Sequence, residues 1–434
     1  MSIQLKILDK IINYGLYLFV FLLPWQTRWI FQEASVNGQV WEYGRLSLYA
    51  SEIILLIVLI LALVRYLKSG SRQFWLSLIL FLIWSGLSII WSLNQSLALY
   101  IWIKVIEALA LFWLVKSRKV NLSFSLLITG FIQAVYGFYQ FLSQGMFAAN
   151  KWLGLAAIDA REPGTSVIEF LDQRWLRAYG SLPHPNIFGG LMAVCLLVAI
   201  IGLWQLNREV KGLKIIPKKS YFLNYFYWLI VIMTFFGLIV SFSRSAWLAF
   251  VASFVYLIVI SFKDKFKVER VINLKIAGVL MIIFAFFFLI FPHQLLTTRL
   301  KGQSRLEQVS LEERADYLDQ AKELIQSNWL LGQGLGNYTQ ALINKDSSLP
   351  GFDYQPVHNL YLLILSELGI VGFVLFICLL WQVFRKSDKA YFSLMLCLLI
   401  IALFDHYLWT LYFSLMIFWL ILGLTQRSDR DSLN

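Results

Sequence analysis

The chain has 434 residues, of which 59% are hydrophobic, 17% aromatic and only 14% charged, and its mean hydropathy is +0.69. Soluble domains are nearer half apolar and a quarter charged, so this composition excludes soluble, disordered and collagen-like chains and indicates a membrane protein. The three cysteines each lie inside a long apolar run, which excludes a disulfide framework and a CxxC metal site.

The first apolar run follows two lysines, as in a signal peptide, but Leu22-Leu23-Pro24-Trp25 offers no small-residue cleavage site, so we expect a retained span. About 20 apolar residues are needed to cross the hydrocarbon core. Twelve runs are candidates: 8–25, 46–66, 74–92, 97–115, 122–143, 186–206, 221–242, 245–262, 271–291, 357–384, 390–404 and 406–424. The sequence predicts an all-α polytopic membrane protein of about twelve transmembrane helices, forming a single membrane domain over residues 1–434.

Charge predicts the orientation. If both termini are cytoplasmic, 23 of the 37 basic residues fall in cytoplasmic segments, together with 7 acidic residues, as the positive-inside rule requires. The formal net charge of +12 is therefore mostly an orientation signal. Because it is dispersed over many short loops, it does not indicate a nucleic-acid partner.

Two external connections, 144–185 and 292–356, are long enough to be functional. In the second, Ser310 and Glu313 fit a capping box that predicts a helix starting there. Apolar residues then recur at helical spacing and predict a face that packs on the membrane domain: Leu311, Ala315, Leu318, Ala321, Leu324 and Ile325. The glycine-rich segment 332–336 follows this helix, so we interpret it as a tight turn and not as a phosphate loop.

Arginines beside the ends of external spans are the first candidate site residues. Arg174 and Arg177 precede the sixth span, Arg244 lies between the seventh and eighth, and Arg305 and Arg314 lie in the large loop. Guanidinium groups stay charged and bind phosphate oxygens in pairs, so converging arginines favour a phosphorylated ligand at the membrane surface. A side chain that only snorkels to the headgroups is the alternative for Arg244.

Histidines supply the candidate proton acceptor. His358 stands at the external start of the tenth span, where an imidazole could take a proton from an attacking hydroxyl, although a structural role is the alternative. His184 lies between two prolines, where it would shape a turn, yet it is near Arg177. Asp405 and His406 fall in a tight connection and could pair there.

Charged residues within the spans are few. Lys104 and Glu107 are three positions apart and could neutralise each other, or line a transport pathway. Glu367 lies nine positions beyond His358 on the opposite helix face, so we do not expect it to be the partner of His358.

Four segments, in order, resemble the O-antigen ligase and O-antigen polymerase superfamily of membrane glycosyltransferases. They span about 170–375: Arg177-Ala178-Tyr179-Gly180 with His184-Pro185-Asn186, then Ser243-Arg244-Ser245-Ala246-Trp247, then Arg314 through Gly332-Gln333-Gly334-Leu335-Gly336-Asn337, and His358-Asn359-Leu360-Tyr361 through Glu367-Leu368-Gly369. A departure is Tyr317 or Leu318, where members often have Trp.

The resemblance implies a multi-pass enzyme of the bacterial inner membrane, whose large helical loop covers a cavity open to the periplasm. Its partners would be an undecaprenyl-diphosphate-linked glycan donor and a lipid A-core or growing-glycan acceptor. By the same resemblance, Arg244 and Arg314 would hold the diphosphate, and His358 would orient or deprotonate the acceptor hydroxyl. Arg177, Arg174, Arg305 and His184 are the further candidates for substrate binding.

A diphosphate is a good leaving group, so arginines that stabilise its departing charge could replace a metal ion. The sequence has no acidic metal-binding cluster, and we expect a metal-independent inverting transfer without a cofactor. Repeat-unit polymerase and protein glycosylation remain open alternatives. From another class, so does a transporter for lipid-linked glycan or a small anion such as bicarbonate, which would need charged or broken helices near the midplane.

Overall fold

The computed structural model describes residues 3–67, 75–118, 120–170, 173–211, 213, 215–301 and 305–426. The helices of the first part are α1 (Ile3–Leu22), α2 (Ala50–Leu67), α3 (Leu76–Leu87), α4 (Gln95–Ser117) and α5 (Ser123–Ser143). Those of the second part are α6 (Pro185–Val210), α7 (Lys218–Val240), α8 (Arg244–Ser261), α9 (Lys267–Ile290), α10 (His293–Lys301), α11 (Arg305–Ser327), α12 (Tyr338–Lys345), α13 (Leu360–Lys386), α14 (Phe392–Phe404), α15 (Tyr407–Thr410) and α16 (Tyr412–Leu424).

The strands form three small antiparallel pairs in the connections. These pairs are β1 (Arg28–Gln32) with β4 (Leu46–Tyr49), β2 (Ser35–Val36) with β3 (Gln39–Val40), and β5 (Val167–Phe170) with β6 (Gln173–Leu176). Short 3-10 turns are η1 (Glu42–Gly44), η2 (Ser88–Trp91), η3 (Asp264–Phe266) and η4 (Gly351–Asp353).

Each of the twelve predicted spans overlaps a helix, although the third also takes in η2 and the last also takes in α15. Within the described residues, seven helices are long and apolar enough to cross a membrane, namely α4 to α9 and α13, and three shorter apolar helices cover Leu76–Trp91, α14 and α16. The last span was predicted to begin at 406, but α16 begins at Tyr412, because Leu411 is extended and separates it from α15. The chain is an all-α polytopic membrane protein, as predicted.

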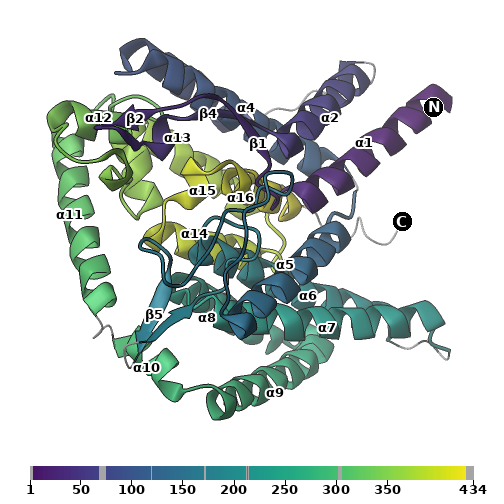
Figure 1. Cartoon of the computed structure of the whole chain (residues 1–434). Coiled ribbons are helices and arrows are strands. Elements are labelled where there is room, and N and C mark those ends of the chain that lie inside the picture. The colour runs from purple at the N-terminus through teal and green to yellow at the C-terminus, as the bar shows by residue number, and fades with distance from the viewer. Residues whose placement is uncertain are drawn as a thin grey trace.

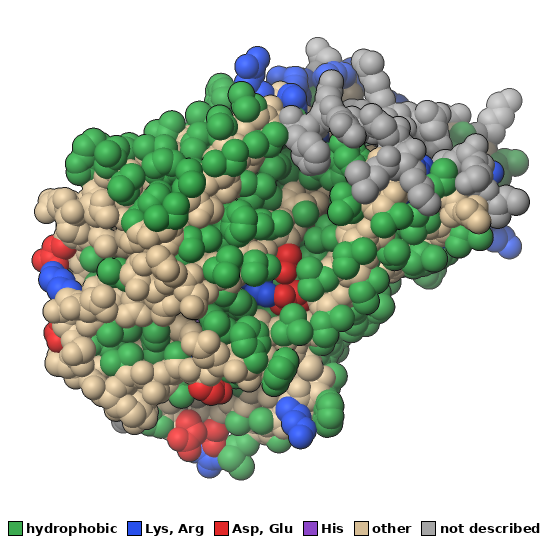
Figure 2. All heavy atoms as spheres, turned by 90° about the horizontal axis from the view of Figure 1, so that it is seen from above, with side chains coloured by type: hydrophobic (Ala, Val, Ile, Leu, Met, Phe, Trp, Pro, Cys, Tyr) green, Lys and Arg blue, Asp and Glu red, His purple; other side chains and the backbone are tan. Residues whose placement is uncertain are grey.

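The connections between the helices gather on one side of the molecule. Figure 1 shows β5, α10, α11 and α12 on this side, at the left, away from the first residues of α1. We call it the loop face. Seen from above that view, Figure 2 shows hydrophobic side chains over much of the surface and few charged ones, which fits a helix bundle in contact with lipid.

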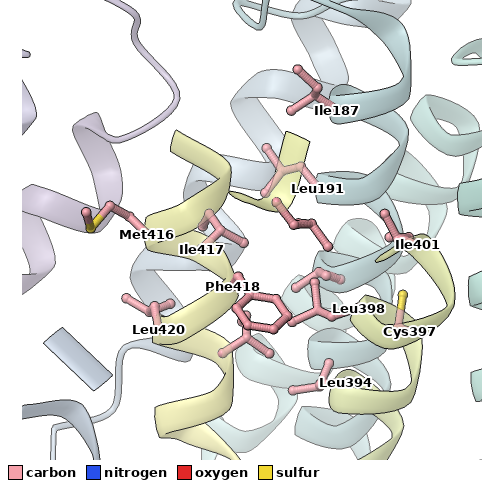
Figure 3. Close-up of a cluster of buried hydrophobic side chains, with 14 of the residues drawn as sticks. Ile187, Leu191, Leu394, Cys397, Leu398, Ile401, Met416, Ile417, Phe418 and Leu420 are labelled. Carbon is pink, nitrogen blue, oxygen red and sulfur yellow. The ribbon is translucent and has the colours of Figure 1, made fainter. Parts of the chain in front are cut away.

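Helix α6 forms the centre of the bundle, since its whole apolar stretch is buried. It packs against α5, α7, α8, α9 and α14. Figure 3 shows Ile187 and Leu191 of α6 against residues of α14 and α16, among them Leu398 and Phe418. Lipid is as apolar as leucine, so close packing and not exclusion of water stabilises these contacts. The packing fixes the first turn of α6 beside the last turn of α14.

Two glycines let neighbouring elements approach the first turn of α6. A Cβ atom on Gly189 would lie 2.7 Å from Ser241 Oγ, and one on Gly190 would lie 2.4 Å from the Tyr407 hydroxyl. Both distances are too short for any other residue type to fit without a shift of the neighbour. The small residues therefore bring the α7–α8 turn and α15 to the same end of α6.

Helix α13 is interrupted at Gly369, whose φ is +64°, and the segment that ends α11 packs into the break. Backbone hydrogen bonds fill the break: Ile370 N to Trp329 O, Gln333 N to Ser366 O and Gly334 N to Glu367 O, all 2.9 Å. The glycine-rich segment 332–336 is thus a tight turn docked on α13, as the sequence predicts.

We predict that Gly369→Ala destabilises the protein by at least about 2 kcal/mol, because the residue is left-handed and the new Cβ would lie 2.1 Å from the Leu330 carbonyl oxygen. Gly278→Ala in α9 is the matched control, since nothing lies within 4 Å of its Cβ position. Unfolding temperatures of the purified variants in detergent test this. Equal temperatures for the two variants would contradict it.

Candidate active site

The turn that joins α7 to α8, Ser241-Phe242-Ser243, lies at the centre of the candidate site. Phe242 has a φ of +47°, which is unusual for a bulky residue, and its ring is fully buried. This turn exposes two carbonyls to arginines. Arg177 Nε donates to Ser241 O at 2.9 Å, and Arg299 Nε donates to Phe242 O at 2.9 Å.

Arg244 begins α8 directly after this turn and meets the α10–α11 segment. It donates to the Arg299 carbonyl at 3.3 Å, and its NH2 group lies 3.1 Å from Glu307 Oε2. The same Glu307 carboxylate forms an ion pair with Arg299, and it is only 5% exposed. One buried acid therefore serves two arginines.

The positive charge of this cluster exceeds its negative charge. Burial lowers the pKa of Arg299, against the effect of Glu307, and the charges of Arg244 and Arg314 lower it further. Burial also lowers the pKa of Arg177 well below its ordinary value, and Arg299 adds to the effect. An anion placed among these groups would be stabilised by several guanidiniums at once.

His358 pairs with Asp405 at the edge of the arginine cluster. His358 Nδ1 lies 3.2 Å from Asp405 Oδ1, and the His358 side chain is 28% exposed while Asp405 is 4% exposed. Asp405 Oδ2 accepts from Ser245 Oγ at 3.0 Å and from Asn186 Nδ2 at 3.5 Å. Asn186 Oδ1 in turn accepts from Arg177 at 2.8 Å, so hydrogen bonds link Arg177 to His358.

Burial acts to raise the pKa of Asp405, but the hydrogen bond and charge of His358, with the charge of Arg314, outweigh it, so the pKa lies below its ordinary value. The carboxylate is ionised at neutral pH and can only accept hydrogen bonds. The proton of the neutral His358 ring therefore sits on Nδ1, which leaves Nε2 as an acceptor.

Arg314, from α11, lies close enough to act electrostatically on the arginine cluster and on this pair. Its charge acts on Arg299, Asp405 and His406. Tyr317, one turn further along α11, lies with its ring 5.9 Å from that of His358. Within the described residues, Arg314 makes no hydrogen bond or ion pair, so its guanidinium is available to a ligand.

The structure thus brings together Arg177, Arg244, Arg314 and His358, four of the seven predicted site residues. Arg174 instead donates to the carbonyls of Arg161 and Glu162 in the 144–185 connection. Arg305 is 75% exposed and lies 3.8 Å from Glu169. The sequence could not separate these two arginines from the other three, because all five lie in predicted external connections.

His184 is next to the site but has a structural partner on each ring nitrogen. Nδ1 accepts from the Asn186 backbone N–H at 3.1 Å and caps α6, while Nε2 lies 3.0 Å from Ser166 Oγ. Burial lowers its pKa to about 3, and the charge of Arg177 contributes. It positions Asn186, in agreement with the turn-shaping role considered from the sequence.

Sequence reasoning missed Arg299 and Glu307 and did not identify Asp405 as the partner of His358. The spacing of residues in the sequence does not reveal the partners of Glu307 and Asp405. Glu307 pairs with Arg244 of a different helix, and Asp405 is 47 residues from His358. Arg299 carries a weak signal, since it is an external basic residue close to a span end.

Three local predictions were wrong. Lys104 pairs with Glu52 of α2 and not with Glu107, because the neighbouring helix supplies a nearer carboxylate. His406 Nδ1 lies 2.9 Å from Thr410 Oγ1 and does not pair with Asp405. Helix α11 begins at Arg305 and not at Ser310, and of its predicted apolar face Ala321 and Leu324 are buried, while Leu311 and Leu318 are exposed.

We predict that Glu307→Ala lowers the free energy of unfolding by about 3 kcal/mol, because Arg299 would stay buried without its carboxylate. Glu323→Ala, in the same helix, breaks the exposed pair with Lys345 and should cost about 0.5 kcal/mol or less. Chemical unfolding of both variants in detergent measures the difference. A harmless Glu307→Ala would contradict the buried cluster.

A second prediction concerns pH. The pKa of His184 is lowered in the fold, so the stability it contributes is present above about pH 6.5 and is lost as the pH falls toward 3. His184→Asn keeps an N-cap acceptor that does not titrate. The unfolding temperature of this variant should fall less than that of the wild type between pH 7 and pH 5, and parallel curves would refute the assignment.

Comparison with known proteins supports the resemblance found in the sequence. Residues 229–377 match the family described as O-antigen ligase, a range that covers Arg244, Arg299, Glu307, Arg314 and His358. No curated protein matches the chain. The matched segment runs from α7 into α13 and includes most of the cluster described above, so this part of the chain is similar to the O-antigen ligase family.

Proposed function

We propose that the protein is an envelope polysaccharide glycosyltransferase of the ligase type. It transfers a glycan from an undecaprenyl-diphosphate donor to a hydroxyl of a lipid or glycan acceptor. It resides in the bacterial inner membrane with its loop face toward the periplasm and its termini in the cytoplasm, the C-terminal residues after Gln426 being outside the described residues. The match of residues 229–377 to the O-antigen ligase family supports a role in envelope polysaccharide synthesis.

The observation that carries the proposal is the excess of guanidinium groups beside a histidine–aspartate pair. Arg244 and Arg299 share one carboxylate, and Arg314 has no anion partner within the described residues. A diphosphate, with its several oxygens and negative charge, matches this unbalanced cluster better than a neutral ligand. Arg244 is 31% exposed, so it can reach a ligand from the loop face.

The transfer follows from this arrangement. His358 Nε2 accepts the proton of the acceptor hydroxyl as its oxygen bonds to the anomeric carbon of the donor sugar. The bond from that carbon to the diphosphate oxygen breaks, and undecaprenyl diphosphate leaves with the bonding electron pair. Asp405 stabilises the protonated His358, and Arg244 and Arg314 stabilise the departing negative charge. Direct displacement inverts the anomeric configuration.

The guanidinium groups supply the positive charge that a metal ion provides in other transferases. Within the ranges that the structure describes, no group of three or more His, Cys, Asp or Glu side chains is arranged to hold a metal. We propose a metal-independent transfer because of the charge that these guanidinium groups supply.

We predict that Arg244→Ala and Arg314→Ala each reduce glycan transfer by about 100-fold or more, because each removes charge stabilisation of the leaving group. Arg305→Ala, in the same large loop, is the matched control and should keep full activity, since its side chain is 75% exposed. A reconstituted assay supplies undecaprenyl-diphosphate glycan with lipid A-core, or with further donor only, with and without chelator. Full transfer by Arg244→Ala would refute the proposal.

A separate prediction tests the proton acceptor. Asp405→Asn should lower kcat by about 100-fold or more and change the acid limb of the pH–rate profile, because an amide does not stabilise protonated His358. The change in profile distinguishes a role in proton transfer from a loss of packing. An unchanged profile with normal kcat would show that His358 acts without Asp405.

A further inference from the structure

A cavity opens between the N-terminal hairpin and the C-terminal helices. Its walls come from residues 42–49, α4, the start of α12 and the connection from α15 to α16. Its lining is rich in aromatic hydroxyls, contributed by Tyr43, Tyr49, Tyr100, Tyr338 and Tyr412. We call it the tyrosine cavity. None of its lining residues belongs to the arginine cluster.

The tyrosine cavity adjoins the candidate active site through one side chain, His406. The His406 ring lies 5.0 Å from the ring of His358, on the active-site side. On the cavity side it lies 5.9 Å from the ring of Tyr43, and its Nδ1 is 2.9 Å from Thr410 Oγ1. The tyrosine cavity and His358 are therefore neighbours, separated by the His406 ring.

The cations that line the cavity are already neutralised. Arg28 and Arg45 both bind Glu42, at 2.7 Å each, and Lys104 binds Glu52. An anion would have to compete with these pairs. The cavity therefore favours a neutral polar ligand, in contrast to the arginine cluster.

Two buried hydroxyls in the lining lack partners. Ser47 Oγ and the Tyr412 hydroxyl make no hydrogen bond within the described residues, although Ser47 is 2% and Tyr412 6% exposed. A buried hydroxyl without a partner is costly, so these groups are suited to a ligand that supplies the missing bonds. Tyr412 stacks on Tyr49 at 4.7 Å between ring centroids, which fixes the position of its hydroxyl.

We propose that the tyrosine cavity is a saccharide subsite that holds one sugar unit of a glycan whose reacting end lies at His358. Sugars present many hydroxyls and an apolar ring face. The hydroxyl groups and paired charges of this lining can bind the sugar hydroxyls, and its aromatic rings can pack on the apolar face. The subsite rests on the proposed function, because it assigns the part of the substrate beyond the reacting bond. The saccharide belongs either to the donor or to the acceptor.

The test uses the full-length protein in detergent and the double variant Ser47→Ala/Tyr412→Phe. These changes remove only the two hydroxyls and keep the stacked ring, so a purely structural role predicts no loss. Ser414→Ala is the matched control, because its buried hydroxyl in the same helix also lacks a partner within the described residues but lines a different cavity. Folding is checked by the unfolding temperature.

The probes are the oligosaccharide released by mild acid from the cell's own lipid-linked glycan, and undecaprenyl diphosphate without sugar. The double variant should bind the oligosaccharide about tenfold more weakly than the wild type, the loss expected for two neutral hydrogen bonds, while Ser414→Ala binds it normally. Binding of undecaprenyl diphosphate should be unchanged in the double variant and lost in Arg244→Ala. Failure of the second result alone would count against the proposed function and not against the subsite.

Transfer kinetics assign the source of the saccharide. A raised KM for the donor alone identifies the donor glycan as the occupant, and a raised KM for the acceptor alone identifies the acceptor glycan. The proposal is overturned if the double variant matches the wild type in oligosaccharide affinity and in both KM values, since the two hydroxyls then bind only water.

Discussion

The buried carboxylate of Asp405 is the interaction on which the rest of the site depends. It accepts hydrogen bonds from His358, Ser245 and Asn186, which lie at the starts of α13, α8 and α6, while Asp405 itself ends α14. An ionised group that is nearly inaccessible must be compensated by such partners. Four helices therefore have to meet at one point, and the reacting groups are positioned where they meet.

The membrane constrains where these charges can lie. Arg177, Arg299 and Asp405 are placed at or beyond helix ends on the loop face, where backbone carbonyls and side chains can satisfy them. Below them, the apolar contacts of α6, α14 and α16 hold the helix ends in register (Figure 3). The backbone of Phe242 has a strained, positive φ, and the surrounding packing holds it in this conformation, as is common at functional sites.

Much of the fold was predictable because membrane spans are long and uniformly apolar. The twelve ranges follow from hydropathy alone, and the tight turn at 332–336 follows from its glycines and its place after a helix. The start of α11 was not predictable, since the Ser310 and Glu313 pattern that suggested a helix start lies inside the longer helix. The strands between α1 and α2 are too short, and too polar in places, to leave a clear period.

The site was predictable in part. Arg244 stands out because it is a basic residue in an external connection, which the positive-inside rule disfavours. His358 stands out because it lies at the external start of a span. The partners were not predictable, since Asp405 and His358 are 47 positions apart and Glu52 reaches Lys104 from another helix. The periodicity of one helix cannot predict contacts between different helices. Arg174 and Arg305 were predicted as site residues because they are arginines in external connections. The structure instead gives them contacts outside the arginine cluster.

The most direct test of the central claim is the structure of the protein with undecaprenyl diphosphate bound, determined by cryo-electron microscopy in lipid. The account predicts that the diphosphate oxygens lie within hydrogen-bond distance of Arg244 and Arg314, with the leaving oxygen directed toward the side of His358. A diphosphate bound away from these arginines, with His358 and Asp405 remote from it, would contradict the account.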